Sequence, residues 1–369
     1  MIEIMTQLKL IISGGGTGGH IFPAIAIAKS IERKIENVEI LFIGSMDRME
    51  MQKVPEAGYN IKGLWISGLQ RNFSFRNLLF PFKLITSLVK ANRILRNFKP
   101  DIVIGTGGFA SGPVLYVAAR SGIPCVVQEQ NSYPGITNRL LSKYVKKICV
   151  AYDDMERFFP NEKIVFTGNP IRKSILSSND NDGKDFFNVN NGRTTVLVIG
   201  GSLGARTINE SIAESLLRFK NEKINLIWQT GLSFQETSES LIQEINTEGI
   251  SCHVFIREME MAYSAADIII SRAGAIAISE LCSIGKPTIL VPSPNVAEDH
   301  QTKNAQSLVN KKSALMVKDV DAKLKLVDEL MFLAGNGSLQ EELSNNIRQL
   351  AVGNAAERIA EIALDLIST

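Results

Sequence analysis

Residues 8–28 read LKLIISGGGTGGHIFPAIAIA, and this stretch decides the fold. Leu8–Ile12 is a short apolar run, which is typical of a buried parallel strand. The run Gly14–Gly19 follows, with Thr17 as its single side chain larger than hydrogen. A helix is predicted from Pro23 to Ala28, because proline is favoured in a first helical turn. A strand, a glycine loop and a helix in this order indicate one βα unit of a parallel sheet.

The glycine loop has the pattern of an anion site. In such a turn the backbone N–H groups and the helix N-terminus point at the ligand, and glycine lets the backbone approach it closely. A tight turn without a ligand is the alternative, although it needs fewer glycines. Gly14, Gly16 and Gly19 also satisfy the GxGxxG spacing of dinucleotide-binding folds. The helix dipole disfavours protonation of His20, so a neutral imidazole here is a candidate general base or hydrogen-bond partner.

Length and composition indicate a globular protein of two domains. A chain of 369 residues is longer than a single core usually supports. Hydrophobic residues make up 45% and charged residues 21%, which suits a sizeable core. The formal net charge of +2 predicts no general attraction to nucleic acid, so nucleic acid is not an expected partner.

The four cysteines are widely spaced and lie in or beside apolar runs. No CxxC pair occurs, so we expect buried small side chains in a reducing compartment. The three histidines lack ligand spacing, and no metal site is predicted. The N-terminus has no signal-peptide pattern, and no run of about 18 uncharged apolar residues is present to span a bilayer.

Basic residues are concentrated in one region of the chain. Between Glu56 and Asp101 there are eight Lys or Arg residues and no acidic residue. Aromatic and aliphatic side chains crowd the same region, and this combination predicts a surface that docks on an anionic membrane. The alternative is a loop and helix packed on the domain with basic residues facing water. The candidate membrane patch consists of Trp65, Arg71, Phe73, Phe75, Arg76, Leu79, Phe80, Phe82 and Lys83.

The strand pattern recurs along the first half of the chain. Further strands are predicted at 38–43, 101–104, 124–128, 148–151 and 164–167. A second glycine turn, GTGGFASGP, begins at Gly105. The polar segment EQNSYPGITN begins at Glu129, and polar side chains directly after a buried strand mark the ligand edge of a parallel sheet.

A second βα domain is predicted after a polar linker at 177–194, which is rich in Asn and Asp. Asp180-Asn181-Asp182 matches the DxD motif of one glycosyltransferase fold, but that motif needs a strand end, so we interpret it as linker. The pattern restarts with a strand at 195–199 and the loop GGSLGAR. Later strands are predicted at 224–229, 252–256, 266–270 and 288–291, and an amphipathic last helix at about 338–367, broken near Gly353.

Two glycine-loop domains facing each other predict a cleft for a nucleoside diphosphate. No GKS or GKT sequence is present for a P-loop, and no GxSxG for a hydrolase elbow. Ser202 and Arg172 are candidate phosphate partners, since a leaving diphosphate needs hydrogen-bond donors and positive charge. Glu280 is suited to hold a ribose diol, because a carboxylate accepts two hydroxyl protons. The alternative for Glu280 is a solvated helix residue or a partner of the helix N-terminal dipole.

Eight segments, taken together and in order, resemble the MurG family of bacterial N-acetylglucosaminyltransferases. They are GGGTGGHIFPAIAIA, GTGGFASGP, QEQNSYPGITN, GNPIR, GGSLGAR, QTG, SRAGAIAISE and VPSP…HQTKNA. The resemblance covers nearly the whole chain and implies an α/β protein of GT-B fold, with two Rossmann-like doubly wound domains separated by a cleft. The implied N-terminal domain, on the acceptor and membrane side, is 1–172 joined by a C-terminal helix at about 352–369. Residues 173–193 are the implied junction and 194–351 the donor domain.

The resemblance implies transfer of N-acetylglucosamine from UDP-N-acetylglucosamine to the muramyl 4-hydroxyl of undecaprenyl-diphosphate-N-acetylmuramoyl-pentapeptide (lipid I). The product is lipid II, a precursor of peptidoglycan. An α donor bond and a β product bond imply inversion. UDP-N-acetylglucosamine is a substrate, and no cofactor is implied. The implied location is peripheral, at the cytoplasmic face of the bacterial plasma membrane, with the anionic surface, lipid I and other cell-wall synthesis proteins as partners.

The resemblance also assigns residues to the donor, with Ile256 contacting uracil through its backbone and Glu280 holding the ribose. The implied donor set is Thr17, Gly18, Gly19, Asn131, Arg172, Ser202, Ile256, Ala275, Ile276, Ala277, Ile278, Ser279, Glu280 and Gln301. Leu203 departs from the family, since many members have Gln there. His20 is the candidate catalytic base, and a base must act on the acceptor face, opposite the leaving diphosphate.

Three alternatives remain at this point. A dinucleotide-dependent oxidoreductase would use the GxGxxG-like loop with Asp47 as the ribose carboxylate. A related UDP-sugar transferase would use another lipid acceptor. A membrane-attached scaffold would bind the UDP-sugar without turnover.

Overall fold

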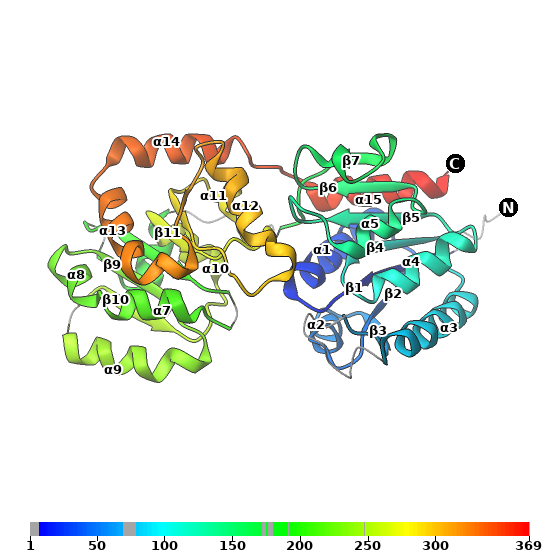
Figure 1. Ribbon diagram of the computed structural model, residues 1–369, viewed down its shortest axis with the longest axis horizontal. Helices are drawn as coiled ribbons and strands as arrows, with labels where there is room; N and C mark the ends of the chain where they lie inside the picture. The colour runs from blue at the N-terminus through cyan, green and yellow to red at the C-terminus, as the bar shows by residue number, and fades with distance from the viewer. Residues whose placement is uncertain are drawn as a thin grey trace. The chain divides into compact units, whose positions relative to one another are not determined.

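The computed structural model describes residues 7–68, 79–171, 175, 180–190, 192–201, 203–246 and 248–368. Contacts divide the chain into two compact units. The first unit runs to Ile171 and resumes at Gly353, and the second lies between these points. Each unit has helices on both faces of one parallel sheet (Figure 1).

The sheet of the first unit has the strand order β3-β2-β1-β4-β5-β6-β7. Its strands are β1 (Leu8–Gly14), β2 (Val38–Ser45), β3 (Asn60–Leu64), β4 (Ile102–Gly107), β5 (Cys125–Glu129), β6 (Lys147–Val150) and β7 (Ile164–Phe166). Alternate residues of β1 enter different cores: Ile11 packs on one face, and Leu10 and Ile12 on the other. Since both faces are covered, the strands read as continuous apolar runs.

The α-helices that the structure describes around this sheet are α1 (Gly18–Lys34), α2 (Glu50–Glu56), α3 (Phe80–Phe98), α4 (Ser111–Arg120), α5 (Ile136–Leu141) and α15 (Ala355–Ser368). The last helix, in red in Figure 1, belongs to this unit although the chain reaches it from the second one. Its apolar face, with Ile359 and Ala363, shares a core with α1. Arg33 and Lys34 at the end of α1 form ion pairs with Glu357 and Glu361.

The sheet of the second unit has the order β10-β9-β8-β11-β12-β13. Its strands are β8 (Thr195–Ile199), β9 (Asn225–Gln229), β10 (Ile250–His253), β11 (Ile268–Ser271), β12 (Thr288–Leu290) and β13 (Leu315–Met316). The helices are α6 (Asp180–Phe186), α7 (Arg206–Ala213), α8 (Leu216–Asn221), α9 (Gln235–Ile245), α10 (Met259–Ala265), α11 (Ala275–Ile284), α12 (His300–Val309), α13 (Ala322–Ala334) and α14 (Gly337–Arg348). The predicted break near Gly353 separates α14 from α15.

Helix α1 begins at Gly18, five residues before the predicted start at Pro23. Thr17 has the extended backbone of an N-cap, and its carbonyl accepts the N–H groups of His20 and Ile21. Pro23 therefore lies inside the helix and is not its opening residue. As a consequence, His20 is the third residue of α1 and points from its first turn.

Two further expectations need correction. The predicted linker at 177–194 contains α6, and Gly183 in this helix lies so close to Met261 and Ala265 of α10 that a Cβ atom would clash. Cys252 is half-buried, whereas the other three cysteines are buried as expected. Burial raises the pKa of the Cys125, Cys149 and Cys282 thiols to about 12 in each case.

Candidate active site

In both units the strand order reverses beside the first strand, between β1 and β4 and between β8 and β11. Loops that leave neighbouring strands in opposite directions expose the carboxyl edge of the sheet at this point, which is where open α/β sheets bind ligands. The loop from Gly14 to Thr17 and the loop after Gly107 meet there in the first unit.

His20 is held at this switch point by β4. Its Nδ1 atom lies 2.9 Å from the carbonyl oxygen of Thr106, and the Thr106 hydroxyl donates a hydrogen bond of 2.8 Å to the His20 carbonyl. A carbonyl can only accept, so the neutral imidazole carries its proton on Nδ1. The lone pair is then on Nε2, the atom that a general base needs.

The absence of side chains at Gly107 and Gly108 permits this contact. Both residues have positive φ angles, of 97° and 84°. A Cβ at Gly107 would lie 2.8 Å from the His20 ring, and one at Gly108 would lie 2.3 Å from the Gly15 carbonyl oxygen. The second glycine turn therefore allows the backbone of the first glycine loop to pack closely against it.

A buried polar network follows β5. Glu129 accepts hydrogen bonds from the backbone and side chain of Asn131 and from the Asn138 side chain. Gln130 lies beside it, with its Oε1 atom 3.2 Å from His20 Nδ1. Burial raises the pKa of the Glu129 carboxyl, and the hydrogen bonds from Asn131, Asn138 and Gly135 oppose that rise. The network connects the predicted residue Asn131 to the surroundings of His20.

Sequence reasoning did not single out Thr106, Glu129, Gln130 or Asn138. The available signal was position for three of them, because Thr106 and Glu129 lie at the ends of β4 and β5 and Gln130 follows β5, whereas Asn138 lies in α5. The polar segment that begins at Glu129 indicates a ligand edge, but it does not indicate which of its residues are buried.

In the second unit, Gln229 connects two predicted elements of the donor site. Its Nε2 atom donates to the carbonyl of Gly201, and its Oε1 atom accepts the N–H of Ile256 at 2.9 Å. Because the Ile256 N–H is already used, a backbone contact from Ile256 to uracil would come from its carbonyl oxygen.

Helix α11 begins at Ala275, after Gly274 in an extended conformation. The predicted segment from Ala275 to Glu280 is therefore the start of this helix, the end that carries positive partial charge. Glu280 is buried, with 8% of its surface exposed, and accepts a hydrogen bond of 3.0 Å from the Tyr263 hydroxyl. It is not the solvated residue of the alternative interpretation.

Gln301 is the second residue of α12, and its Oε1 atom accepts the N–H of Ser293 at 2.9 Å. The turn before the helix contains Glu298 and Asp299, which both have φ angles of 53°. Left-handed backbone at consecutive non-glycine residues is costly and is found most often at functional sites.

The predicted residues thus divide between the units. The first unit contains His20, Thr17, Gly18, Gly19 and Asn131, and the second contains Ile256, the 275–280 segment and Gln301. Arg172 and Ser202 lie outside the described residues, as do Arg71, Phe73, Phe75 and Arg76 of the membrane patch.

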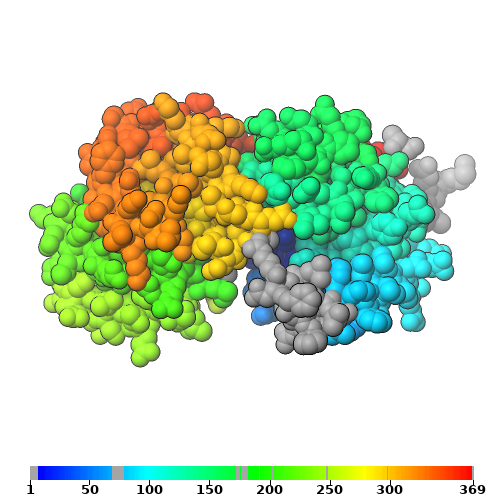
Figure 2. Space-filling view, viewed as in Figure 1, coloured from blue at the N-terminus to red at the C-terminus, as the bar shows by residue number. Residues whose placement is uncertain are grey.

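Helix α3 carries three described residues of that patch, Phe80, Phe82 and Lys83, while Trp65 and Leu79 precede it. It buries a face of Ser87, Ala91, Ile94 and Leu95, and leaves Phe82, Ile85 and Val89 exposed by 65%, 59% and 66%. Trp65 and Leu79 are also exposed, Phe80 is partly exposed, and the Lys83 ammonium lies over the Trp65 ring. The space-filling view shows α3, in light blue, at the surface of its unit (Figure 2).

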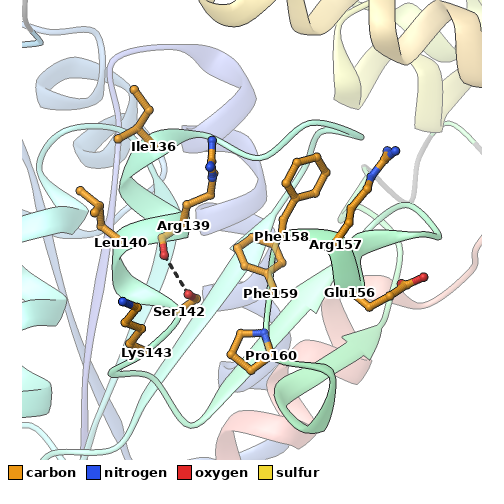
Figure 3. Close-up of a pocket in the computed structure, with 10 residues that line it drawn as sticks. All are labelled: Ile136, Arg139, Leu140, Ser142, Lys143, Glu156, Arg157, Phe158, Phe159 and Pro160. Atoms are coloured by element: carbon orange, nitrogen blue, oxygen red, sulfur yellow. Dashed lines mark hydrogen bonds between the residues drawn. The ribbon is translucent and has the colours of Figure 1, made fainter.

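A groove of about 570 Å³ lies between α5 and the segment 156–160. Arg139 and Arg157 lie on either side of Phe158 (Figure 3), with guanidinium groups 5.9 and 4.9 Å from its ring centre. Within the described ranges, no carboxylate forms an ion pair with either arginine or with Lys143. The exposed side chains of Ile136 and Leu140 are apolar parts of the lining, which also contains the polar side chains of Ser142 and Glu156.

Among the described residues, no group of three or more His, Cys, Asp or Glu side chains is placed to hold a metal ion. None of the described helices is both long and apolar enough to cross a bilayer.

Both halves of the chain match domains of one enzyme family. Residues 10–150 match the glycosyltransferase family 28 N-terminal domain, and residues 195–359 match the glycosyltransferase family 28 C-terminal domain. Fold and domains together define a glycosyltransferase with the GT-B architecture. The dinucleotide-dependent oxidoreductase interpretation is not supported.

Full-length relatives and a solved structure specify the family further. The chain is 51% identical over 369 residues to the UDP-N-acetylglucosamine--N-acetylmuramyl-(pentapeptide) pyrophosphoryl-undecaprenol N-acetylglucosamine transferase of Flavobacterium psychrophilum, covering 99% of each protein. It is 53% identical over 363 residues to the enzyme of the same name from Cytophaga hutchinsonii, covering 98% of this chain and 97% of that one. The crystal structure of Acinetobacter baumannii MurG superposes with a TM-score of 0.79 at 29% identity, covering 97% and 99%. The chain belongs to the MurG family.

Proposed function

We propose that this chain transfers N-acetylglucosamine from UDP-N-acetylglucosamine to the muramyl 4-hydroxyl of undecaprenyl-diphosphate-N-acetylmuramoyl-pentapeptide, forming lipid II for peptidoglycan synthesis. The observation that carries this proposal is identity of about half of all positions, over the full length, to relatives named for that activity. UDP-N-acetylglucosamine is then a substrate, and the transfer needs no metal ion in this proposal.

His20 is the proposed general base. As the muramyl O4 attacks C1 of N-acetylglucosamine, its proton moves to Nε2 of His20. The bond between C1 and the diphosphate oxygen breaks, and UDP leaves with the electron pair. A single displacement of this kind inverts the configuration at C1. The support is the contact of His20 Nδ1 with the Thr106 carbonyl, which leaves the lone pair on Nε2.

Residues of the second unit hold the donor in this proposal. The start of α11 and the loop with Gly201 and Ser202 stabilise the charge of the diphosphate, together with Arg172. Glu280 accepts hydrogen bonds from the ribose hydroxyls, and the Ile256 carbonyl accepts one from uracil. Gln301 and Asn131 are further proposed polar contacts of the donor, and Thr17, Gly18 and Gly19 complete the proposed donor-binding set.

The proposed location is the cytoplasmic face of the plasma membrane, where the enzyme binds as a peripheral protein beside other cell-wall synthesis enzymes. The exposed apolar stripe of α3 supports this proposal, because Phe82, Ile85 and Val89 recur at helical spacing next to basic residues. Arg139, Lys143 and Arg157 of the groove beside α5, for which the described residues provide no ion-pair partner, add positive charge on the same unit.

Product stereochemistry and donor choice test the proposed reaction. The purified chain is incubated with a lipid I analogue and UDP-N-acetylglucosamine, UDP-N-acetylgalactosamine or UDP-glucose in turn, and the product linkage is read by NMR. We expect a β linkage and a clear preference for UDP-N-acetylglucosamine. An α linkage would exclude a single displacement with His20 as the base.

A further inference from the structure

Glu50, the first residue of α2, is a carboxylate with no exposed surface. Its two oxygens accept different backbone N–H groups. Oε2 accepts that of Gly16, in the first glycine loop, at 2.9 Å, and Oε1 accepts that of Ser45, at the end of β2, at 2.9 Å. The carboxylate therefore ties the loop between β1 and α1 to the neighbouring strand.

Two glycines make room for this side chain. A Cβ atom at Gly15 would lie 2.1 Å from Oε1 and 2.4 Å from the carboxyl carbon of Glu50. A Cβ at Gly44 would lie 2.5 Å from the Glu50 Cγ atom. Glu50 cannot move aside cheaply, because a shift would break both hydrogen bonds and leave buried polar groups unpaired.

We propose that Glu50 is a positioning residue for the transfer reaction, acting through the first glycine loop on His20. Gly16 is followed by Thr17, the N-cap residue of α1, and His20 is in the first turn of that helix. Glu50 fixes the entry of this turn from the β2 side, while Thr106 fixes His20 from the β4 side. The two contacts together define where the Nε2 atom lies.

This assignment changes the role expected for the first glycine loop. The Gly16 N–H points to Glu50 and is not available to a substrate phosphate. The loop therefore acts as a rigid support for His20, and the glycines at 15 and 44 make room for the residue that holds it.

Replacement of Glu50 by Gln tests the hydrogen bonds with little change of shape. The amide oxygen can accept one N–H, but the NH₂ group then faces the other N–H. We expect kcat to fall about 10- to 100-fold, while donor affinity by calorimetry changes less than about threefold. Ser30→Ala is the matched control, because its buried hydroxyl in α1 has no partner in the described chain, and we expect wild-type turnover.

The substitution Gly15→Ala tests the geometry directly. In the wild-type background, its methyl group collides with Glu50, so we expect a loss of turnover comparable to that of Glu50→Ala. In a Glu50→Ala background the collision is absent. Adding Gly15→Ala to that variant should therefore lower kcat by less than about a further twofold. Additive losses in the double variant would overturn the proposal, as would unchanged kcat in both Glu50→Gln and Glu50→Ala.

The inference rests on the proposed role of His20, but the two can fail separately. If His20→Ala keeps wild-type turnover while the Gly15 and Glu50 losses remain non-additive, His20 is not the base and Glu50 still positions the loop. If His20→Ala abolishes turnover and the Glu50 variants are fully active, the base assignment stands and the Glu50 proposal is wrong. Thermal unfolding of each variant shows whether a loss of kcat accompanies a loss of fold.

Discussion

The Nδ1 atom of His20 lies 2.9 Å from the carbonyl oxygen of Thr106 on the neighbouring strand. The acceptor is a backbone atom, so the contact persists whatever side chain occupies position 106. It fixes the imidazole tautomer and directs the basic nitrogen away from β4.

The substitution His20→Asn separates this contact from the proposed catalysis. The Asn side-chain amide can donate to the Thr106 carbonyl in place of Nδ1, but it has no basic nitrogen. We expect turnover to fall by about 100- to 10,000-fold, with a thermal unfolding midpoint close to wild type. Steady-state turnover and calorimetry measure the two quantities, and wild-type turnover in this variant would remove His20 from the mechanism.

Glu280→Ala tests the proposed ribose contact. The ribose is remote from the reacting carbon, so loss of the contact weakens binding of ground state and transition state equally. We expect donor KM to rise about 10- to 100-fold with little change in kcat. Tyr263→Phe is the control, because it removes the hydroxyl bonded to Glu280 Oε2 and keeps the carboxylate. An unchanged KM in Glu280→Ala would contradict the assignment.

Phe82→Ser combined with Ile85→Ser tests the membrane surface on α3. We expect the double variant to bind vesicles that contain an anionic phospholipid more weakly than wild type does. We also expect wild-type binding to fall as the salt concentration rises. The paired control is Val320→Ser with Leu324→Ser, which removes apolar side chains of the second unit that are even more exposed. Flotation assays measure the bound fraction. Equal loss in both pairs, or binding that salt does not change, would argue against a docking role for α3.

The buried carboxyl of Glu129 gives an expected pH dependence of stability. Its pKa is raised in the folded state, mainly by burial. The unfolded state then loses its proton first as pH rises, so the stabilisation is complete below the ordinary carboxyl pKa and is lost as pH rises through the folded value. Urea titrations measure the free energy of unfolding of each protein. The value for wild type minus the value for Glu129→Gln should decrease as pH rises. An increase would show that the hydrogen bonds from Asn131, Asn138 and Gly135 outweigh burial.

Most strands could be predicted from sequence because both faces of each sheet are covered. Leu10, Ile11 and Ile12 are all buried, so a run of apolar residues is the signal. The edge strand β3, with sequence NIKGL, lacks that signal and was not predicted, and neither was the two-residue strand β13. The start of α1 was misplaced because Pro23 is a stronger sequence signal than the backbone conformation of Thr17.

The candidate site was predictable only where its residues are local in sequence. His20 stands beside the glycine loop, and its position alone suggested a role. Its contacts with Thr106 and Gln130 span 86 and 110 residues and follow from strand order, which no local pattern contains. Glu50 was missed for the same reason, since its partner Gly16 is 34 residues away.

Transfer of labelled sugar to a lipid acceptor tests the central claim most directly. The full chain is incubated with UDP-N-acetylglucosamine labelled in the sugar and with a lipid I analogue, with a chelator present throughout, and label in the lipid product is counted. We predict label in the product, and none when the acceptor lacks the muramyl 4-hydroxyl. No transfer to the intact acceptor, in a protein that still binds the donor by calorimetry, would contradict the proposed function.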